Sequence, residues 1–304
     1  MAVLAALGSG ALCTCGGETT LPPISWSSED FDFADEANYP LCGRTLDYQQ
    51  TFVDLAQDIF GQPKSRRKFT YYSLFFDGDT FAHFCPPEFT GCYRDGQVFS
   101  TIVPDLHEAT HAVVALAIGR SHPFFSEGIA EVFRDRVGGS RSSGMTTVDE
   151  GLGFDGIHAA LPPELYPRAG HFMSYVLAVH GQDAALDLLT RARPGDSVDD
   201  LHGDLEAALG LDFDELMADY ATVPECRSGQ YRWPITECTG APLAARLGRW
   251  DLVEQLDCER DDVIGPRVGD QWTVRTIEVP AAGRYRITVT AAEDAGALVE
   301  VGHC

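Results

Sequence analysis

The sequence contains two histidines and a glutamate at a spacing that is typical of metal sites. His107 and His111 are four residues apart, and Glu108 directly follows His107. On an α-helix, residues four apart lie one turn apart on the same face, so both imidazoles can reach one ion. Glu108 then lies at the rim of that ion, where a carboxylate can take a proton from an activated water. This spacing predicts the centre of a metal-dependent hydrolase.

The sequence around this motif predicts the helix that the motif needs. Pro104 suits the first turn of a helix, residues 106–118 contain no helix breaker, and Gly119 supplies a stop. Apolar residues recur at helical spacing and would bury one face: Leu106, Ala109, Val113, Leu116 and Ala117. A helix buried in this way would hold its ligands rigidly.

A third ligand is expected on a second helix. A catalytic Zn²⁺ takes three protein ligands and keeps one open position. Glu127 follows His111 by sixteen residues, with Ser126 before it as the expected N-cap, and Glu131 lies one turn further on. We expect Glu127 to be the third zinc ligand and Glu131 to accept the ring N–H of a ligand histidine. The alternative is that both glutamates are solvated helix charges.

This arrangement resembles a known family. The HExxH motif, a short connection, an aromatic residue and then EG-x-A are similar to the gluzincin metallopeptidases, in particular the compact bacterial peptidase-MA-like group. Members usually carry a tryptophan shortly before the EG pair, where this chain has Phe124 and Phe125. The resemblance covers residues 42–223. It implies a zincin-like α+β fold, one Zn²⁺ per chain held by His107, His111 and Glu127, and a peptide or protein substrate.

Two residues are candidates for stabilising an oxyanion. Peptide hydrolysis passes through a tetrahedral oxyanion, which benefits from a hydrogen-bond donor opposite the general base. Tyr166 lies at the entry to a helix expected at residues 167–179, and His171 lies within that helix. The alternative is that both side chains only pack and cap. Further helices are expected at residues 45–60, 183–193 and 198–220.

Two strands are expected before the motif helix. Residues 69–76 and 97–103 alternate in β fashion, and a loop containing Cys85 and Cys92 connects them. In gluzincins, a strand with an open edge lies beside the active-site helix and pairs with an extended peptide. We expect residues 98–102 to form that edge, which would place the scissile bond over the metal.

Composition narrows the class of partner. The chain has 304 residues and a formal net charge of −24. Phosphate binding requires clustered Lys and Arg, so nucleic acid is excluded as an expected partner. The length predicts about two domains.

The amino-terminal sequence indicates export. Residues 1–15 form an apolar segment that ends in Cys13 and Cys15 and resembles a secretory or lipoprotein signal without its basic region. Residues 16–41 resemble a leader or linker. No other stretch is apolar enough to span a bilayer. We therefore expect a periplasmic, cell-surface or extracellular protein, with an N-terminal lipid anchor as one alternative.

The nine cysteines favour the same location. None has the paired CxxC spacing of a zinc module, and most lie in loop-like sequence, which favours disulfides over free thiols. The pairs that we expect are Cys85–Cys92, Cys226–Cys238 and Cys258–Cys304.

Residues 224–304 differ from the rest in pattern. Several segments alternate in β fashion, and residues 280–283 predict a hairpin turn. We expect a small disulfide-linked β-sandwich, which either stabilises the catalytic domain or binds a surface or substrate.

Taken together, the sequence predicts a zincin-like α+β domain at residues 42–223 followed by a small β domain at residues 224–304. The expected activity is zinc-dependent peptide hydrolysis, with Glu108 as the general base. The alternative is a catalytically lapsed peptidase fold that acts as a secreted or surface binding module. The intact Glu108 argues against this alternative, because a lapsed enzyme does not need the base.

Overall fold

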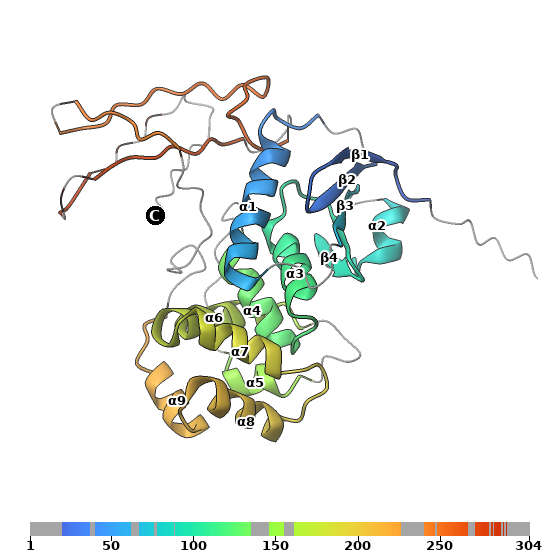
Figure 1. Ribbon diagram of the computed structural model, residues 1–304, viewed down its shortest axis with the longest axis vertical. Coiled ribbons are helices and arrows are strands. Elements are labelled where there is room, and N and C mark those ends of the chain that lie inside the picture. The colour runs from blue at the N-terminus through green and yellow to red at the C-terminus, as the bar shows by residue number, and fades with distance from the viewer. Residues whose placement is uncertain are drawn as a thin grey trace, which may run out of the picture.

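The chain forms a mixed α+β structure. The computed structural model describes residues 20–36, 40–61, 67–75, 78–87, 89–134, 146–154, 161–225, 240–246, 248–266, 271–279, 281, 283–286, 288 and 290. In Figure 1 the sheet lies beside α1 in the upper part of the molecule and a lobe of helices lies in the lower part, with α3 between the sheet and this lobe.

The sheet has a parallel centre and antiparallel edges. Its strands are β1 (Ile24–Ser27), β2 (Phe31–Asp35), β3 (Phe69–Ser73), β4 (Gly91–Arg94) and β5 (Gln97–Ser100). Their order is β1-β2-β3-β5-β4. Strands β2, β3 and β5 are parallel, whereas β1 and β4 run antiparallel to their neighbours. The short β4–β5 connection turns at Asp95 and Gly96, which both have positive φ.

Residues 16–41 are not simply a leader or linker, because they contain β1 and β2. Phe31 and Ala34 are fully buried, and the alternating apolar pattern of β2 places Phe31 and Phe33 in the main core. Ring stacking between Phe31 and Phe69 joins β2 to β3. The acidic and polar residues around this strand obscured its short apolar alternation.

The predicted substrate edge was also wrong. Strand β5 contains Val98 but lies inside the sheet, between β3 and β4. The edge strand at this end of the sheet is β4, which pairs with β5 from Gly91↔Ser100 to Arg94↔Gln97. A short strand with one tyrosine and no aliphatic residue carries little periodic signal, so β4 was not predicted.

The helices largely follow the expected ranges. They are α1 (Thr45–Phe60), α2 (Asp79–Phe84), α3 (Leu106–Ala117), α4 (Pro123–Phe133), α5 (Val148–Leu152), α6 (Tyr166–Tyr175), a π-helical turn (Val176–His180), α7 (Gln182–Arg191), α8 (Val198–Leu209) and α9 (Phe213–Tyr220). Gly210 has φ 75° and ends α8, so the range expected at residues 198–220 is divided into α8 and α9.

Two hydrophobic clusters divide the molecule into layers. One face of the sheet, with α1, α3, α4 and α6, contributes to the larger cluster, in which Phe52, Tyr71 and Val113 are buried. The other face carries a smaller cluster with Phe81 of α2 and Phe99 of β5. Helix α3 is therefore held between the sheet and the helical lobe, and this position fixes the motif residues in the middle of the molecule.

The disulfides confirm one expected pair and correct another. Cys85 bonds Cys92, as expected. Cys258 bonds Cys42 instead of Cys304, and the two partners are 216 residues apart in sequence. Backbone hydrogen bonds beside this bridge join the start of α1 to the same distant segment, with the N–H of Gly43 donating to the carbonyl of Cys258 at 3.2 Å. Cys226, Cys238 and Cys304 lie outside the described residues.

The carboxyl-terminal segment is extended where it is described, and in Figure 1 it lies beyond the upper end of α1. Residues 240–246, 248–266 and 271–279 contain isolated bridges, for example between Ile264 and Trp272, but no strand. The predicted β-sandwich is therefore not seen in these ranges, and the expected hairpin at residues 280–283 falls partly outside the described residues. Ionic contacts of Arg260 and Arg275 with Glu254 and Asp262 connect the segment internally.

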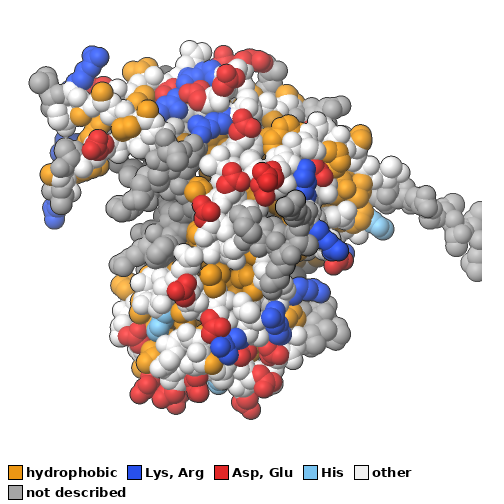
Figure 2. Space-filling view, viewed as in Figure 1, with side chains coloured by type: hydrophobic (Ala, Val, Ile, Leu, Met, Phe, Trp, Pro, Cys, Tyr) orange, Lys and Arg blue, Asp and Glu red, His pale blue; other side chains and the backbone are white. Residues whose placement is uncertain are grey.

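The surface is strongly acidic, and acidic side chains gather over α8 and α9 at the lower end of the molecule in Figure 2. Two disulfides are present among the described residues, which points to folding in an oxidising compartment. Within the same described ranges, every helix is too short or too polar to cross a membrane.

The Cys42–Cys258 bridge should contribute strongly to stability. It links residues 216 apart, so it restricts the unfolded chain over a long loop. We expect the double substitution Cys42→Ser/Cys258→Ser to lower the free energy of unfolding by about 2–4 kcal/mol, measured by denaturant titration. Reduction of the wild-type protein should lower the free energy of unfolding further than the double substitution does, because it also opens Cys85–Cys92. An unchanged denaturation midpoint in the double variant would contradict this role.

Candidate metal centre

The start of α3 is fixed by an aspartate. Asp105 is the N-cap, and one carboxylate oxygen accepts a hydrogen bond from the backbone N–H of Glu108 at 3.2 Å. Its other oxygen accepts from the Ser100 hydroxyl at 2.6 Å, which ties the helix start to β5. Pro104 therefore lies in the turn before the helix instead of in its first turn. At the far end, Gly119 has φ 106° and ends the helix as expected.

Helix α4 begins earlier than expected. His122, not Ser126, is the N-cap, and Pro123 occupies the first helical position. The Nδ1 atom of His122 accepts from the backbone N–H of Phe124 at 3.3 Å, while Nε2 lies 2.9 Å from the carbonyl oxygen of Phe154. These two contacts require a neutral imidazole that accepts at Nδ1 and donates at Nε2. The earlier start places Ser126 inside the first turn, free to face α3.

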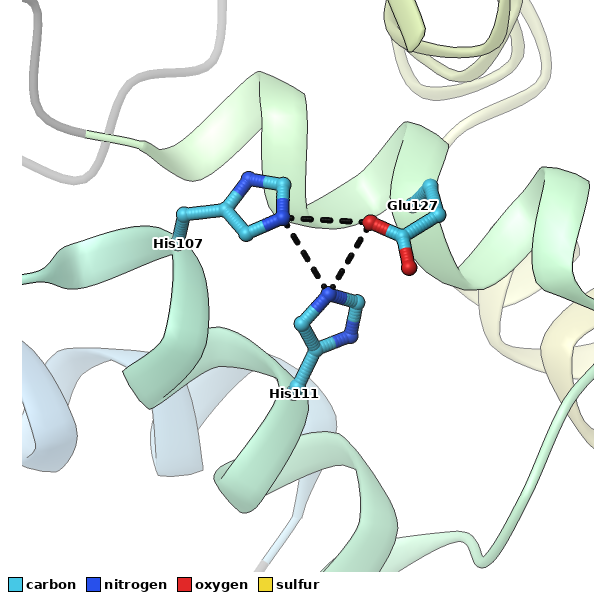
Figure 3. A group of neighbouring side chains, drawn as sticks. All are labelled: His107, His111 and Glu127. Carbon is cyan, nitrogen blue, oxygen red and sulfur yellow. Dashed lines mark hydrogen bonds and ion pairs between the residues drawn. The ribbon is translucent and has the colours of Figure 1, made fainter. Parts of the chain in front are cut away.

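Three side chains from α3 and α4 converge on one point (Figure 3). The Nε2 atoms of His107 and His111 lie 3.2 Å apart, and each lies 3.1 Å from one carboxylate oxygen of Glu127. These are the three residues that could hold a metal ion among those that the structure describes.

The separations fit a tetrahedral metal ion. Ligand atoms about 2.0–2.1 Å from a tetrahedral zinc ion are about 3.3 Å from one another. The three observed separations, 3.1, 3.1 and 3.2 Å, are close to this value. Two nitrogen atoms and one oxygen atom also match the donor types of catalytic zinc sites, and three ligands leave one position open.

Charge interactions are strong within the triad, by which we mean His107, His111 and Glu127. Burial opposes the charged form of His107, but the hydrogen bond and negative charge of Glu127 outweigh it and raise the pKa of His107 to about 9. Burial would raise the pKa of Glu127, yet the two histidines hold it well below its usual range. The site therefore favours an ionised Glu127 with positive charge beside it. A metal cation would compete for this position with the protons on the two histidines.

The outward-facing histidine nitrogens also have partners, and all of them come from α4. The Nδ1 atom of His107 lies 3.5 Å from Glu131, the residue expected beside a ligand histidine. Arg134 contacts both carboxylate oxygens of Glu131, at 2.8 and 3.1 Å. The Nδ1 atom of His111 lies 3.2 Å from the Ser126 hydroxyl. Such contacts orient ligand rings.

Sequence reasoning missed the roles of Ser126 and Arg134. The spacing of three between Glu131 and Arg134 was an available signal, because such residues are neighbours on a helix surface. The role of Ser126 depended on the packing of α3 against α4, for which the sequence held no comparable signal.

Glu108 is buried beside the triad. One of its carboxylate oxygens has no hydrogen-bond partner among the described residues. Burial raises its pKa to about 7, although the neighbouring His107 and His111 oppose this shift. Gly91 of β4 makes room for it, since a Cβ there would lie 2.7 Å from Cγ of Glu108. A carboxyl group with a pKa near neutrality suits a general base.

Tyr166, the first residue of α6, lies beside the candidate metal centre. Its ring is nearly parallel to that of His107, with centroids 6.0 Å apart and an interplanar angle of 15°. Burial and the charges of Glu127 and Glu108 raise the pKa of its hydroxyl far above the usual value, so the group stays protonated and can donate a hydrogen bond. Close packing of α4 on α6 depends on Gly128, where a Cβ would lie 2.6 Å from the Ala169 carbonyl oxygen.

His171 is not brought to the triad. Its Nδ1 atom lies 2.6 Å from the Tyr220 hydroxyl and its Nε2 atom lies 3.0 Å from the Pro224 carbonyl. Both ring nitrogens are therefore engaged in a separate buried network that joins α6 to α9. This corrects its predicted role as an oxyanion donor. A histidine on an amphipathic helix carries no local signal that separates these two roles.

Comparison with known proteins adds no further assignment. No family model, curated protein or solved structure matches the chain. The resemblance to gluzincins therefore rests on the motif residues, and the case for a metal centre rests on the geometry of His107, His111 and Glu127.

The cap of α4 should make stability sensitive to acid. Burial lowers the pKa of His122, with its hydrogen bond to Phe154 and the charge of Asp196 opposing the shift. The unfolded chain, with a histidine pKa of about 6.5, therefore binds more protons, and stability should fall as pH drops below about 6.5 until the lower folded pKa is passed. His122→Asn keeps a capping side chain and should reduce this slope in pH-dependent unfolding.

The exposed His83 provides a matched control for this measurement. His83→Asn should leave the pH dependence of unfolding as in the wild type. If His122→Asn also left the slope unchanged, protonation of the cap would not be a source of acid destabilisation.

Each member of the triad should be needed for metal binding. Loss of one ligand leaves two, too few for a catalytic site. We expect Glu127→Ala to reduce divalent-metal content from about one equivalent per chain to a small fraction, measured by elemental analysis after gentle purification. Glu206→Ala, on the exposed surface of α8, is the matched control and should retain the metal. Full metal retention by a folded Glu127→Ala variant would exclude Glu127 as a ligand.

Proposed function

We propose that the protein is a zinc-dependent metallopeptidase. The observation that carries this proposal is the convergence of His107, His111 and Glu127 with Glu108 buried beside them. Zinc is favoured because two imidazole nitrogens and one carboxylate oxygen are common catalytic zinc ligands. When bound, zinc would lower the pKa of a water towards about 7 and polarise the substrate carbonyl.

Glu108 would act as the general base. Its pKa of about 7 allows it to accept a proton from the attacking water and to donate that proton to the departing amine nitrogen. The burial that raises this pKa also shields the carboxylate from bulk water. The absence of a side chain at Gly91 leaves the room that the Glu108 side chain occupies beside the triad.

Tyr166 would stabilise the oxyanion that forms at the substrate carbonyl. Its hydroxyl stays protonated next to the charges of Glu127 and Glu108 and is therefore a donor throughout the reaction. With His171 engaged elsewhere, Tyr166 is the donor of this pair that remains for the role.

The substrate would be an extended peptide or protein segment that pairs with β4. This strand is bonded to β5 on one side and is the last in the described sheet. Its first residue, Gly91, touches Glu108, so a peptide along the outer edge would pass the general base. Backbone pairing holds a peptide without strong selection for its side chains.

We also propose that the protein acts outside the cytoplasm. The disulfides support an oxidising location, and the apolar start of the chain resembles an export signal. The net charge of −24 supports a substrate other than nucleic acid.

Peptide cleavage tests the proposal directly. The wild-type protein should cleave members of a diverse peptide mixture, and Glu108→Gln should lower kcat about 10²- to 10⁴-fold because it removes the base. Mass spectrometry of the products gives the rates and the cleavage sites. Metal content of Glu108→Gln should stay near that of the wild type, which separates loss of the base from loss of the ion.

Two outcomes would contradict parts of the proposal. Equal cleavage by both proteins would remove Glu108 from the mechanism. Absence of cleavage by a fully metal-loaded wild-type protein would favour a binding module over an enzyme. Glu206→Gln is the control for the substitution itself, since it lies on the exposed face of α8 and should cleave as the wild type does.

A further inference from the structure

Tyr166 has a second aromatic neighbour besides His107. The ring of Phe89 is nearly parallel to that of Tyr166, with centroids 6.3 Å apart and an interplanar angle of 21°. The corresponding values for Tyr166 and His107 are 6.0 Å and 15°. Both distances lie within the range over which aromatic rings attract one another. The Tyr166 ring is therefore nearly parallel to both Phe89 and His107, and His107 is a candidate metal ligand.

Phe89 is held on a short loop that is fastened at several points. The Cys85–Cys92 disulfide joins the end of α2 to β4 across this loop. The backbone N–H of Phe89 donates to the Pro86 carbonyl at 3.2 Å, and the Thr90 carbonyl accepts from the backbone N–H of Thr101 at 2.9 Å. The Thr90 contact ties the residue after Phe89 to the segment that follows β5, and the disulfide joins the two ends of the loop.

Core packing does not explain this side chain. Phe89 is half-buried and belongs to neither hydrophobic cluster among the described residues. The neighbouring Phe84, by contrast, packs on the smaller cluster and stacks on Phe99 with centroids 4.4 Å apart. Among the described residues, the aromatic contact of Phe89 is with Tyr166.

We propose that Phe89 is a positioning residue that holds the Tyr166 ring beside His107, and that the Cys85–Cys92 loop presents it for this purpose. The proposal deepens the proposed function, since Tyr166 is the oxyanion donor there. Phe89 would raise the rate by keeping the Tyr166 hydroxyl at the place where the oxyanion forms, without touching the oxyanion itself.

The positioning can be measured without any turnover. In protein labelled in its tyrosine rings, the NMR signals assigned by Tyr166→Phe should move in Phe89→Ala towards those of an exposed tyrosine, and ring flipping should become faster. Phe89→Tyr, which keeps an aromatic ring, should preserve the wild-type signals. Phe84→Ala is the matched control and should leave the Tyr166 signals in place. Unmoved Tyr166 signals in a folded Phe89→Ala variant would overturn the proposal.

Kinetics then tests the consequence. Phe89→Ala should lower kcat about three- to tenfold with little change in KM, and Phe89→Tyr should restore it. In the Tyr166→Phe background, Phe89→Ala should cause no further loss, because the hydroxyl that it positions is absent. A full additional loss would show that Phe89 acts independently of Tyr166 and would overturn the proposal. If the wild-type protein cleaves no peptide, the proposed function fails, while the NMR measurement still decides whether Phe89 positions Tyr166.

Discussion

The site depends on holding three electron-pair donors close to one point. Two imidazole nitrogens and a carboxylate oxygen, 3.1–3.2 Å apart, favour a cation or a proton between them. Such an arrangement persists only where the backbone on each side is held firmly. The capping contacts of Asp105 and His122 hold the starts of α3 and α4, and the large hydrophobic cluster packs the two helices together.

Helix α4 organises most of what surrounds the ligands. It carries Glu127, the partners of both candidate ligand histidines, and Gly128, which allows α6 to approach closely enough to bring Tyr166 to the site. The sheet contributes from the other side, where Gly91 of β4 borders Glu108. Glu108, the proposed general base, lies on α3 beside the sheet, whereas Tyr166, the proposed oxyanion donor, comes from α6 in the helical lobe.

Local patterns were sufficient for most of the longer helices and for the spacing of the motif, but not for the short helices α2 and α5 or for the start of α4. The range of α1 and the stop at Gly119 agree with expectation because helix periodicity and glycine conformation act within a few residues. Strand β2 and the partner of Cys258 were predicted wrongly for the opposite reason. The burial of β2 depends on β3, and the partner of Cys258 lies 216 residues away. The edge expected at residues 98–102 was wrong for the same reason, because β4, which begins at Gly91, pairs with β5 and covers that edge.

The sequence alone therefore determined the candidate ligand types, their placement on helices and the identity of the neighbouring acid Glu108, because helical spacing is a local property. Tertiary structure decided which side chains meet. It brought Glu127 within 3.1 Å of both histidine nitrogens, drew Tyr166 in beside His107, and directed His171 to Tyr220. Contacts between distant helices depend on packing across the core, and a single sequence holds no periodic signal for such packing.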